Sequence, residues 1–193
     1  MNPFTVLCRH CDPSSRAFEI LVTHSVLVTR KARKIALAYL ERTPDAEIDL
    51  ELLVEASMLH DIGIVRCHAP DIGCTGDEPY IRHGVLGRQM LEAEGLPAHA
   101  LVCERHTGAG ITADEVRGQS LPLPERDYLP VTIEEKIICV ADKFYGKNPA
   151  KLWREKSWRK IARRLSRHGD DVTRRWAALS HEILARSDDD DAP

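Results

Sequence analysis

Metal-binding side chains recur along this 193-residue chain, and each falls on the apolar side of a predicted helix. An ionised carboxylate among apolar side chains loses on the order of several kcal/mol of hydration free energy, so it requires a cation, a shifted pKa or a metal ion. A single inward-facing histidine is more simply a hydrogen-bonded core residue. Together these residues indicate a metal site: His24, His60, Asp61, His83, His106 and Asp142.

The number of these residues favours two metal ions over one. Four imidazoles and two carboxylates exceed the ligands of one tetrahedral site. They match two ions that share a bridging carboxylate and keep positions open for water. Asp61 is the candidate bridge. Imidazole-rich sites with some carboxylate suit iron, manganese, nickel or zinc, and the sequence leaves that choice open.

Helical periodicity and helix-boundary signals predict the elements that position these residues. The predicted helices cover residues 16–40 with His24, 50–60 with His60, 80–94 with His83, a segment after Pro97 that runs through His106, 132–145 with Asp142, and two charged helices over 154–167 and 170–186. Asp49 is expected to cap the second helix and Gly63 to close it, while Thr132 and Glu135 predict a capping box. Because no segment shows the period-two alternation of a strand, the predicted fold class is all-α.

Two polar loops, Cys67–Pro79 and Gly118–Pro130, are rich in turn-forming residues. The first is longer than most connections in compact domains, and such loops often carry function. We expect these two loops to hold the determinants of substrate identity.

The bulk composition is that of an ordinary globular protein, with 43% hydrophobic and 30% charged residues. No apolar run approaches the ~20 residues of a membrane span, and the first residues lack the pattern of a secretory signal, so a cytoplasmic protein without a membrane partner is expected. The net charge of -3 gives no reason to expect nucleic acid. The basic run from Arg30 to Lys34 is interpreted as a solvated helix face.

Four of the cysteines allow a second interpretation. Cys8 and Cys11, together with Cys67 and Cys74, could form a structural zinc site that pins the amino terminus over the loop. The spacing of the second pair is long for a zinc site. Free buried thiols are therefore the favoured interpretation.

In their order along the chain, these residues resemble the HD superfamily of metal-dependent phosphohydrolases. The resemblance spans roughly residues 20 to 147 and is carried by His24, His60-Asp61-Ile62-Gly63, His83, His106 and Ala141-Asp142-Lys143. It implies an HD-domain helical bundle. It also implies that His24, His60, Asp61 and Asp142 hold one metal, that Asp61, His83 and His106 hold a second, and that a metal-bound hydroxide attacks phosphorus.

Further stretches, Glu104–Ile111 and Thr132–Ile137, resemble an HDIG subgroup without a known substrate. The chain departs from the superfamily in two ways. Many members place a lysine directly after His-Asp-Ile-Gly to meet a phosphate, whereas this chain has Ile64. Members that cleave cyclic-di-GMP carry a second histidine where this chain has Thr107, together with a Gly-Tyr-Pro signature that it lacks, which disfavours that activity.

Other cations are needed to meet a phosphate, and four are candidates for substrate binding: Arg66, Arg82, Arg105 and Lys143. Arg66 has the most favourable placement in the sequence. Arg66 and Lys143 join Asp61 as candidate catalytic residues.

The predicted function is hydrolysis of a phosphomonoester or phosphodiester, on a nucleotide or another small phosphorylated metabolite. The same ligands also serve di-iron oxygenases of the superfamily. A non-catalytic module that binds metal and nucleotide is a further alternative, supported by the missing lysine.

The predicted organisation has one domain with appendages. An N-terminal segment covers residues 1–15, the HD domain 16–150, a C-terminal helical extension of the same domain 151–187, and a disordered acidic tail 188–193. Trp153, Trp158 and Trp176 are expected either to pack the extension on the core or to form a homodimer contact.

Overall fold

The computed structural model describes residues 1–185, so the predicted acidic tail and the last two residues of the predicted extension lie outside the described residues. Helices dominate, which confirms the predicted all-α fold class. The helices are α1 Pro3–His10, α2 Arg16–Arg42, α3 Leu50–Leu59, α4 His83–Ala93, α5 Pro97–Arg105, α6 Ala113–Gly118, α7 Ile133–Lys143, α8 Trp158–Leu165 and α9 Asp170–Leu184.

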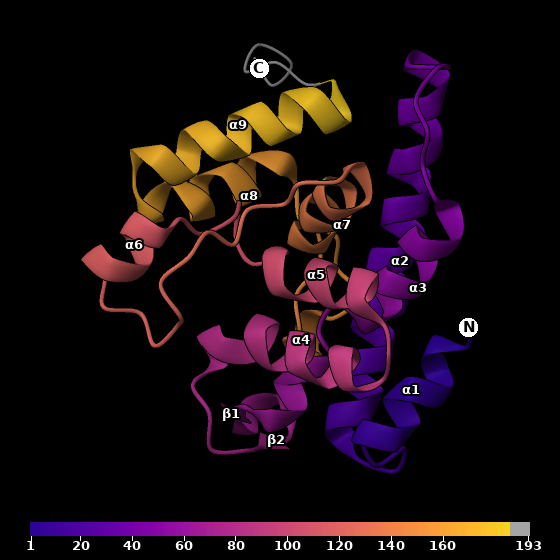
Figure 1. Ribbon diagram of the computed structural model, residues 1–193, viewed down its shortest axis with the longest axis vertical. Helices are drawn as coiled ribbons and strands as arrows, with labels where there is room; N and C mark the ends of the chain where they lie inside the picture. Colours follow the sequence, from indigo (N-terminus) through magenta and orange to yellow (C-terminus); the bar gives the residue numbers. More distant parts are fainter. Residues whose placement is uncertain (186–193) are drawn as a thin grey trace.

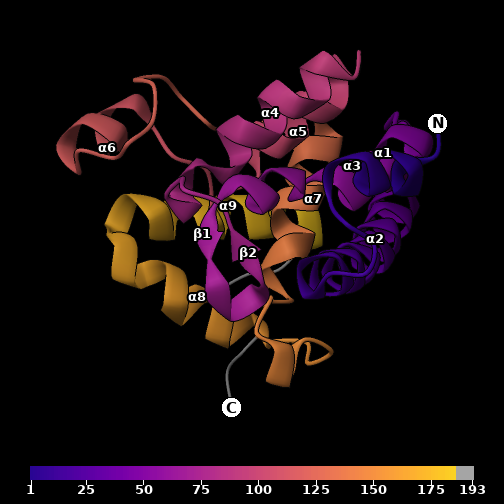
Figure 2. The same ribbon diagram turned by 90° about the horizontal axis from the view of Figure 1, so that it is seen from below.

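Helix α7 lies at the centre of the bundle, packed between α2 and α9, with α5 beside it (Figure 1). Helices α4 and α5 form an antiparallel pair at one end, and α1 and α3 pack together near the start of α2. Figure 2 shows α6 and α8 on the same side of the molecule.

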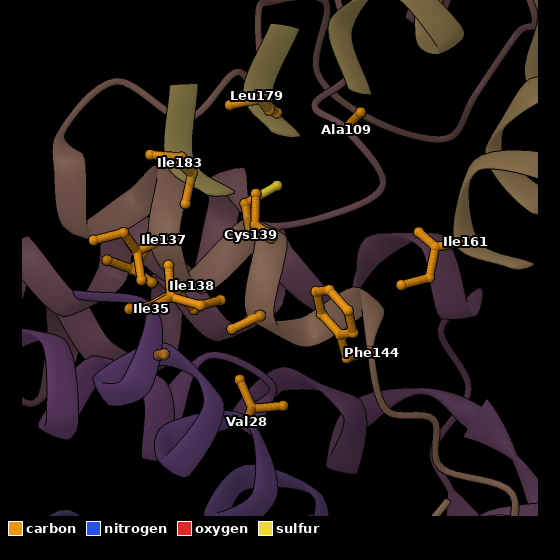
Figure 3. Close-up of a cluster of buried hydrophobic side chains, with 14 of the residues drawn as sticks. Val28, Ile35, Ala109, Ile137, Ile138, Cys139, Phe144, Ile161, Leu179 and Ile183 are labelled. Carbon is orange, nitrogen blue, oxygen red and sulfur yellow. The ribbon is translucent and has the colours of Figure 1, made fainter. Parts of the chain in front are cut away.

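Two apolar clusters hold these helices together. The larger one joins α2, α3 and α7 to α8 and α9, and Figure 3 shows Val28, Ile138 and Ile183 among its members. The second joins α1, the start of α2, α4 and α5 around Leu21 and Leu59, both fully buried. The residues of the predicted metal site lie in or directly after helices that contribute to these two clusters.

Side-chain caps begin the helices as predicted at Asp49 and Thr132, but the complete capping box lies at Thr112 and not at Thr132. Ser15, Asp49 and Thr132 each accept a backbone N–H of the first turn through the side chain. The predicted capping box at Thr132 is only half formed, because the Glu135 carboxylate accepts the N–H of Val131 instead. A complete box occurs at Thr112 and Glu115, where α6 was not predicted.

The sequence predicted that Gly63 closes α3, and this prediction is wrong. That helix ends at Leu59, and Gly63 lies within a 3-10 turn, Ile62–Arg66. A Cβ at this position would overlap the carbonyl oxygen of His83 and lie 2.5 Å from the amide nitrogen of Gly87. Gly63 is therefore required for the close approach of this turn to α4.

The loop Cys67–Pro79 is more regular than predicted. Two short strands, β1 His68–Ala69 and β2 Cys74–Thr75, pair antiparallel within it. Short 3-10 turns, Pro70–Ile72 and Tyr80–Arg82, complete the path to α4, and others occur at Pro149–Lys151 and Ser166–His168. Helix α1 was also missed, within the segment described only as N-terminal.

Within residues 1–185, none of the helices combines the length and apolar composition that crossing a membrane requires.

Candidate metal centre

The structure brings all six predicted metal-binding residues together in the interior. They form two groups: His24, His60, Asp61 and Asp142 in one, and Asp61, His83 and His106 in the other. Within each group the ligand atoms lie within 4.8 Å of one another, and every one of these residues is buried. Asp61 belongs to both groups.

Three of the histidines are oriented by the backbone just before them. Nδ1 of His60, His83 and His106 donates to the carbonyl oxygen three residues earlier in the chain, at 2.7 Å in each case. His60 and His106 stand at the ends of α3 and α5, and His83 begins α4. A proton held on Nδ1 leaves the Nε2 lone pair free to bind a metal.

Asp61 presents one carboxylate oxygen to each group. Its Oδ2 lies 3.1 Å from Nε2 of His24 and 3.0 Å from Nε2 of His60. Its Oδ1 lies 3.6 Å from Nε2 of His83 and 3.5 Å from Nε2 of His106. This division of the two oxygens is the arrangement that a bridging carboxylate adopts between two metal ions.

Asp142 completes the first group from the central helix α7. Its Oδ1 lies 3.0 Å from Nε2 of His24 and 3.6 Å from Nε2 of His60. Lys143 Nζ donates to the other carboxylate oxygen at 2.5 Å.

The donor set fits divalent metal ions. Three buried atoms of the centre form no hydrogen bond: Nε2 of His60 and the two carboxylate oxygens of Asp61. They nevertheless lie within ion-pair distance of each other or of neighbouring histidine and lysine side chains. Nε2 of His83 faces Nε2 of His106 at 3.2 Å, and both rings already use their Nδ1 protons elsewhere. Lone pairs that converge in this way require a shared cation or proton. Both groups could hold metal ions.

The electrostatics keep the carboxylates ionised. Burial alone would raise the pKa of Asp61, but Lys147 and His60 outweigh it and hold that pKa well below its ordinary value. Lys143 and His24 do the same for the pKa of Asp142, again against burial. Burial and the neighbouring His106 lower the pKa of His83 to about 3, so this imidazole is neutral at physiological pH.

Lys147 is the residue that the sequence interpretation missed. Its Nζ lies 2.5 Å from Oδ2 of Asp61, and its side chain is 14% exposed. Ile64, at the position where a lysine was expected, is fully buried in the second apolar cluster. The ammonium beside Asp61 therefore comes from the segment after α7. A lysine five residues beyond Asp142 was the available signal.

A cavity of about 530 Å³ borders the metal centre at His83, His106 and Asp142. Lysine and arginine side chains line it as well: Lys143, Lys147, Lys156 and Arg164. The volume lies within the range of small-molecule sites.

Three of the four cations that the sequence suggested for substrate binding lie outside the cavity lining. Lys143 lines the cavity, whereas Arg66, Arg82 and Arg105 are absent from its lining. Arg66 is exposed, Arg82 pairs with Glu78 at 2.8 Å, and Arg105 pairs with Glu135 at 3.0 Å.

The cysteines are free thiols. Cys11, Cys67 and Cys74 are buried and Cys8 is half-buried. Burial raises the pKa of both Cys67 and Cys74 to about 11, which keeps them protonated. The metal-competent groups among residues 1–185 consist of histidine and aspartate alone.

The family model described as the HD domain matches residues 21–146. An uncharacterized protein of Methanocaldococcus jannaschii is 41% identical over 125 residues, which is 64% of this chain and 65% of that protein. No solved structure matches the chain significantly.

Two further relatives are named tRNA (cytidine(56)-2'-O)-methyltransferases. The one from Picrophilus torridus is 33% identical over 130 residues, 67% of this chain and 32% of that protein. The one from Thermoplasma volcanium is 30% identical over 131 residues, 67% of this chain and 33% of that protein. The chain thus spans slightly less than two thirds of the first relative and about a third of the methyltransferases.

The match to the family model covers more than half of the chain and contains all six residues of the metal centre. This protein belongs to the HD-domain family.

Proposed function

We propose that this protein is a metal-dependent phosphohydrolase that acts on a small phosphorylated compound. The observation that carries the proposal is the position of the two ligand groups, joined by Asp61, at the wall of a cavity lined by lysines. Divalent ions, when bound, lower the pKa of a coordinated water and polarise phosphoryl oxygens.

The residues of the chain have separate parts in this proposal. Asp61 and Asp142 hold the negative charge that binds the ions, and the Nδ1 bonds of the histidines fix their rings in place. Lys143 and Lys147 lie at the boundary between the centre and the cavity. There they are positioned to orient phosphoryl oxygens. We assign this role to the two lysines in place of Arg66, Arg82 and Arg105.

The di-iron oxygenase alternative uses the same ligands. The cationic lining of the cavity favours the hydrolase, because lysines bind phosphoryl oxygens as point charges. The methyltransferase activity in two relatives' names is not proposed for this chain, since the match covers about a third of each of those proteins.

A phosphoester and nucleotide panel assayed without oxygen tests the proposal. We expect release of phosphate or of a phosphomonoester by the metal-loaded protein, and a loss of at least about 10²-fold in Asp61→Ala. His99→Ala is the matched control, because His99 is a buried histidine outside both groups that pairs with Glu55. Turnover that requires oxygen would favour the oxygenase. Full metal loading without turnover of any compound would favour the non-catalytic module.

A further inference from the structure

The far wall of the cavity is built by the part of the chain that follows the family match. The match ends at residue 146, whereas Lys156, Ile161, Arg164 and Leu165 all line the cavity. The last three lie on α8. The metal centre and this wall therefore come from different parts of the sequence.

The cavity has a cationic part beside the metal centre. Lys143 and Lys147 are already paired with Asp142 and Asp61, at 2.5 Å each. Lys156 donates to the backbone carbonyls of Lys143 and Tyr145, which are neutral acceptors. Its ammonium charge is therefore not matched by a carboxylate in direct contact.

Arg164 adds a second cation of this kind. It is exposed, and within residues 1–185 it forms no ion pair with a carboxylate. Burial lowers the pKa of Lys156 to about 8 against the pull of Asp142, and Arg164 contributes to the lowering. The one carboxylate of the lining outside the centre, Glu115, is paired with Arg175 at 2.7 Å. The excess charge of this wall is positive.

Apolar side chains form another part of the cavity lining. Ile161, Leu165 and Val172 line it from the C-terminal helices, and Ile111 and Leu121 line it from the segments around α6. Figure 3 shows Ile161 at the edge of the larger apolar cluster, apart from Ile137 and Ile183. An apolar surface that borders a cavity favours a ligand with an apolar part.

We infer that the C-terminal segment selects organic phosphates whose uncharged part is largely apolar, with the anionic group held between the metal centre, Lys156 and Arg164 and the apolar group packed on Ile161 and Leu165. This inference rests on the proposed function for the identity of the anion as a phosphate. It assigns specificity to residues beyond the family match.

A pair of phosphonates tests the inference without turnover, because their P–C bond is not hydrolysed. Binding of phenylphosphonate and methylphosphonate to the metal-loaded protein is measured by calorimetry. The two probes share the same head group, so their difference reports the apolar wall. We expect phenylphosphonate to bind about tenfold or more tightly, as expected for burial of a phenyl group. Equal affinities would overturn the inference.

Variants on α8 separate the two parts of the cavity. Ile161→Ala is expected to reduce the preference for the phenyl compound several-fold and to leave methylphosphonate affinity unchanged. Arg164→Glu is expected to weaken both compounds about tenfold. Because Ile161 is buried in the core, Arg164→Glu remains the informative variant if Ile161→Ala is unstable.

Arg163→Glu is the matched control, since Arg163 is exposed on the same helix and does not line the cavity. Equal weakening by the two arginine variants would also overturn the inference. If the proposed hydrolase activity fails while the phosphonates bind in the expected order, the inference about the wall stands and only the function is wrong.

Discussion

At the scale of single residues, the metal centre depends on charge compensation inside the protein. Asp61 is fully buried, and its carboxylate is approached by four histidines and by the ammonium of Lys147. Removing one partner from a buried ion pair leaves an uncompensated charge, which costs more than the pair itself contributes. Lys147 compensates the charge of Asp61, and metal ions, when bound, would compensate the same carboxylate.

Replacing Lys147 by methionine should destabilise the metal-free protein more than the metal-loaded one. We expect a loss of about 3 kcal/mol in unfolding free energy without metal, because the charge of Asp61 is then poorly compensated. Bound cations should restore most of that loss. Thermal unfolding with a chelator and with excess manganese measures both states. An equal loss in the two conditions would contradict the role given to Lys147.

The sequence could single out the six candidate ligands because each was expected on the apolar side of a predicted helix, and the structure brings them together in the interior. Periodicity reports that face directly. It does not report which exposed cations converge on a site, and the structure places Arg66, Arg82 and Arg105 outside the cavity lining. Lys147 and Lys156 reach the centre and the cavity only through the path of the chain after α7, and local signals carry no information about that path.

At the scale of secondary-structure elements, the close contact between the turn Ile62–Arg66 and α4 positions His83 relative to Asp61. Gly63→Ala should disrupt it, because the added Cβ overlaps the carbonyl oxygen of His83. We expect a loss of about 3 kcal/mol in stability from this overpacking, together with reduced metal content. Gly118→Ala is the control, because a Cβ there meets nothing within 4 Å. Equal stability of the two variants would show that the turn Ile62–Arg66 and α4 leave room for a Cβ.

The ion pair between Glu115 and Arg175 ties α6 to α9. Burial alone would raise the pKa of Glu115, but Arg175 and the backbone N–H of Thr112 outweigh it and lower that pKa below its usual 4.5. A lowered folded-state pKa means that the ionised form stabilises the fold. This contribution is complete above pH 4.5 and is lost as the pH falls through the lower folded-state value.

Glu115→Gln should therefore lower the unfolding free energy by about 1–2 kcal/mol at pH 7, and the difference from the unmodified protein should shrink below pH 4.5. Denaturant unfolding at several pH values measures it. Glu125→Gln removes an exposed pair with Arg117 and should change stability little. A difference that grows toward low pH would reverse the expected sign.

Boundary signals predicted most helices but missed two short ones. Helix α1 is capped by Asn2, whose side chain accepts the N–H of Phe4, and α6 carries a complete capping box. Both helices are too short for their apolar spacing to stand out from a loop. The pairing of β1 with β2 involves two residues per strand, so no alternation could reveal it.

At the scale of the whole molecule, the C-terminal helices share the core of the metal-binding helices. Trp176 is 1% exposed and belongs to the same apolar cluster as Val28 and Ile138. Trp153, by contrast, is 71% exposed. Trp158 is partly buried against the same cluster, so Trp158 and Trp176 pack the extension on the core, whereas Trp153 does not.

Trp176→Ala should lower stability by about 3–5 kcal/mol and should do so in a single unfolding transition that includes the metal centre. Trp153→Ala should have little effect. Unfolding followed by far-ultraviolet circular dichroism, together with loss of bound metal, measures whether the transitions coincide. Two separate transitions would show that the C-terminal helices unfold independently.

Asp61 belongs to both ligand groups, so the number of metal ions bound per chain depends on this residue more than on any other ligand. After saturation with manganese or zinc and removal of free ions, the unmodified protein should hold about two ions per chain. His83→Ala and His24→Ala should each lose one ion, Asp61→Ala should lose both, and His99→Ala should lose none. Full metal content in Asp61→Ala would show that Asp61 does not join the two groups.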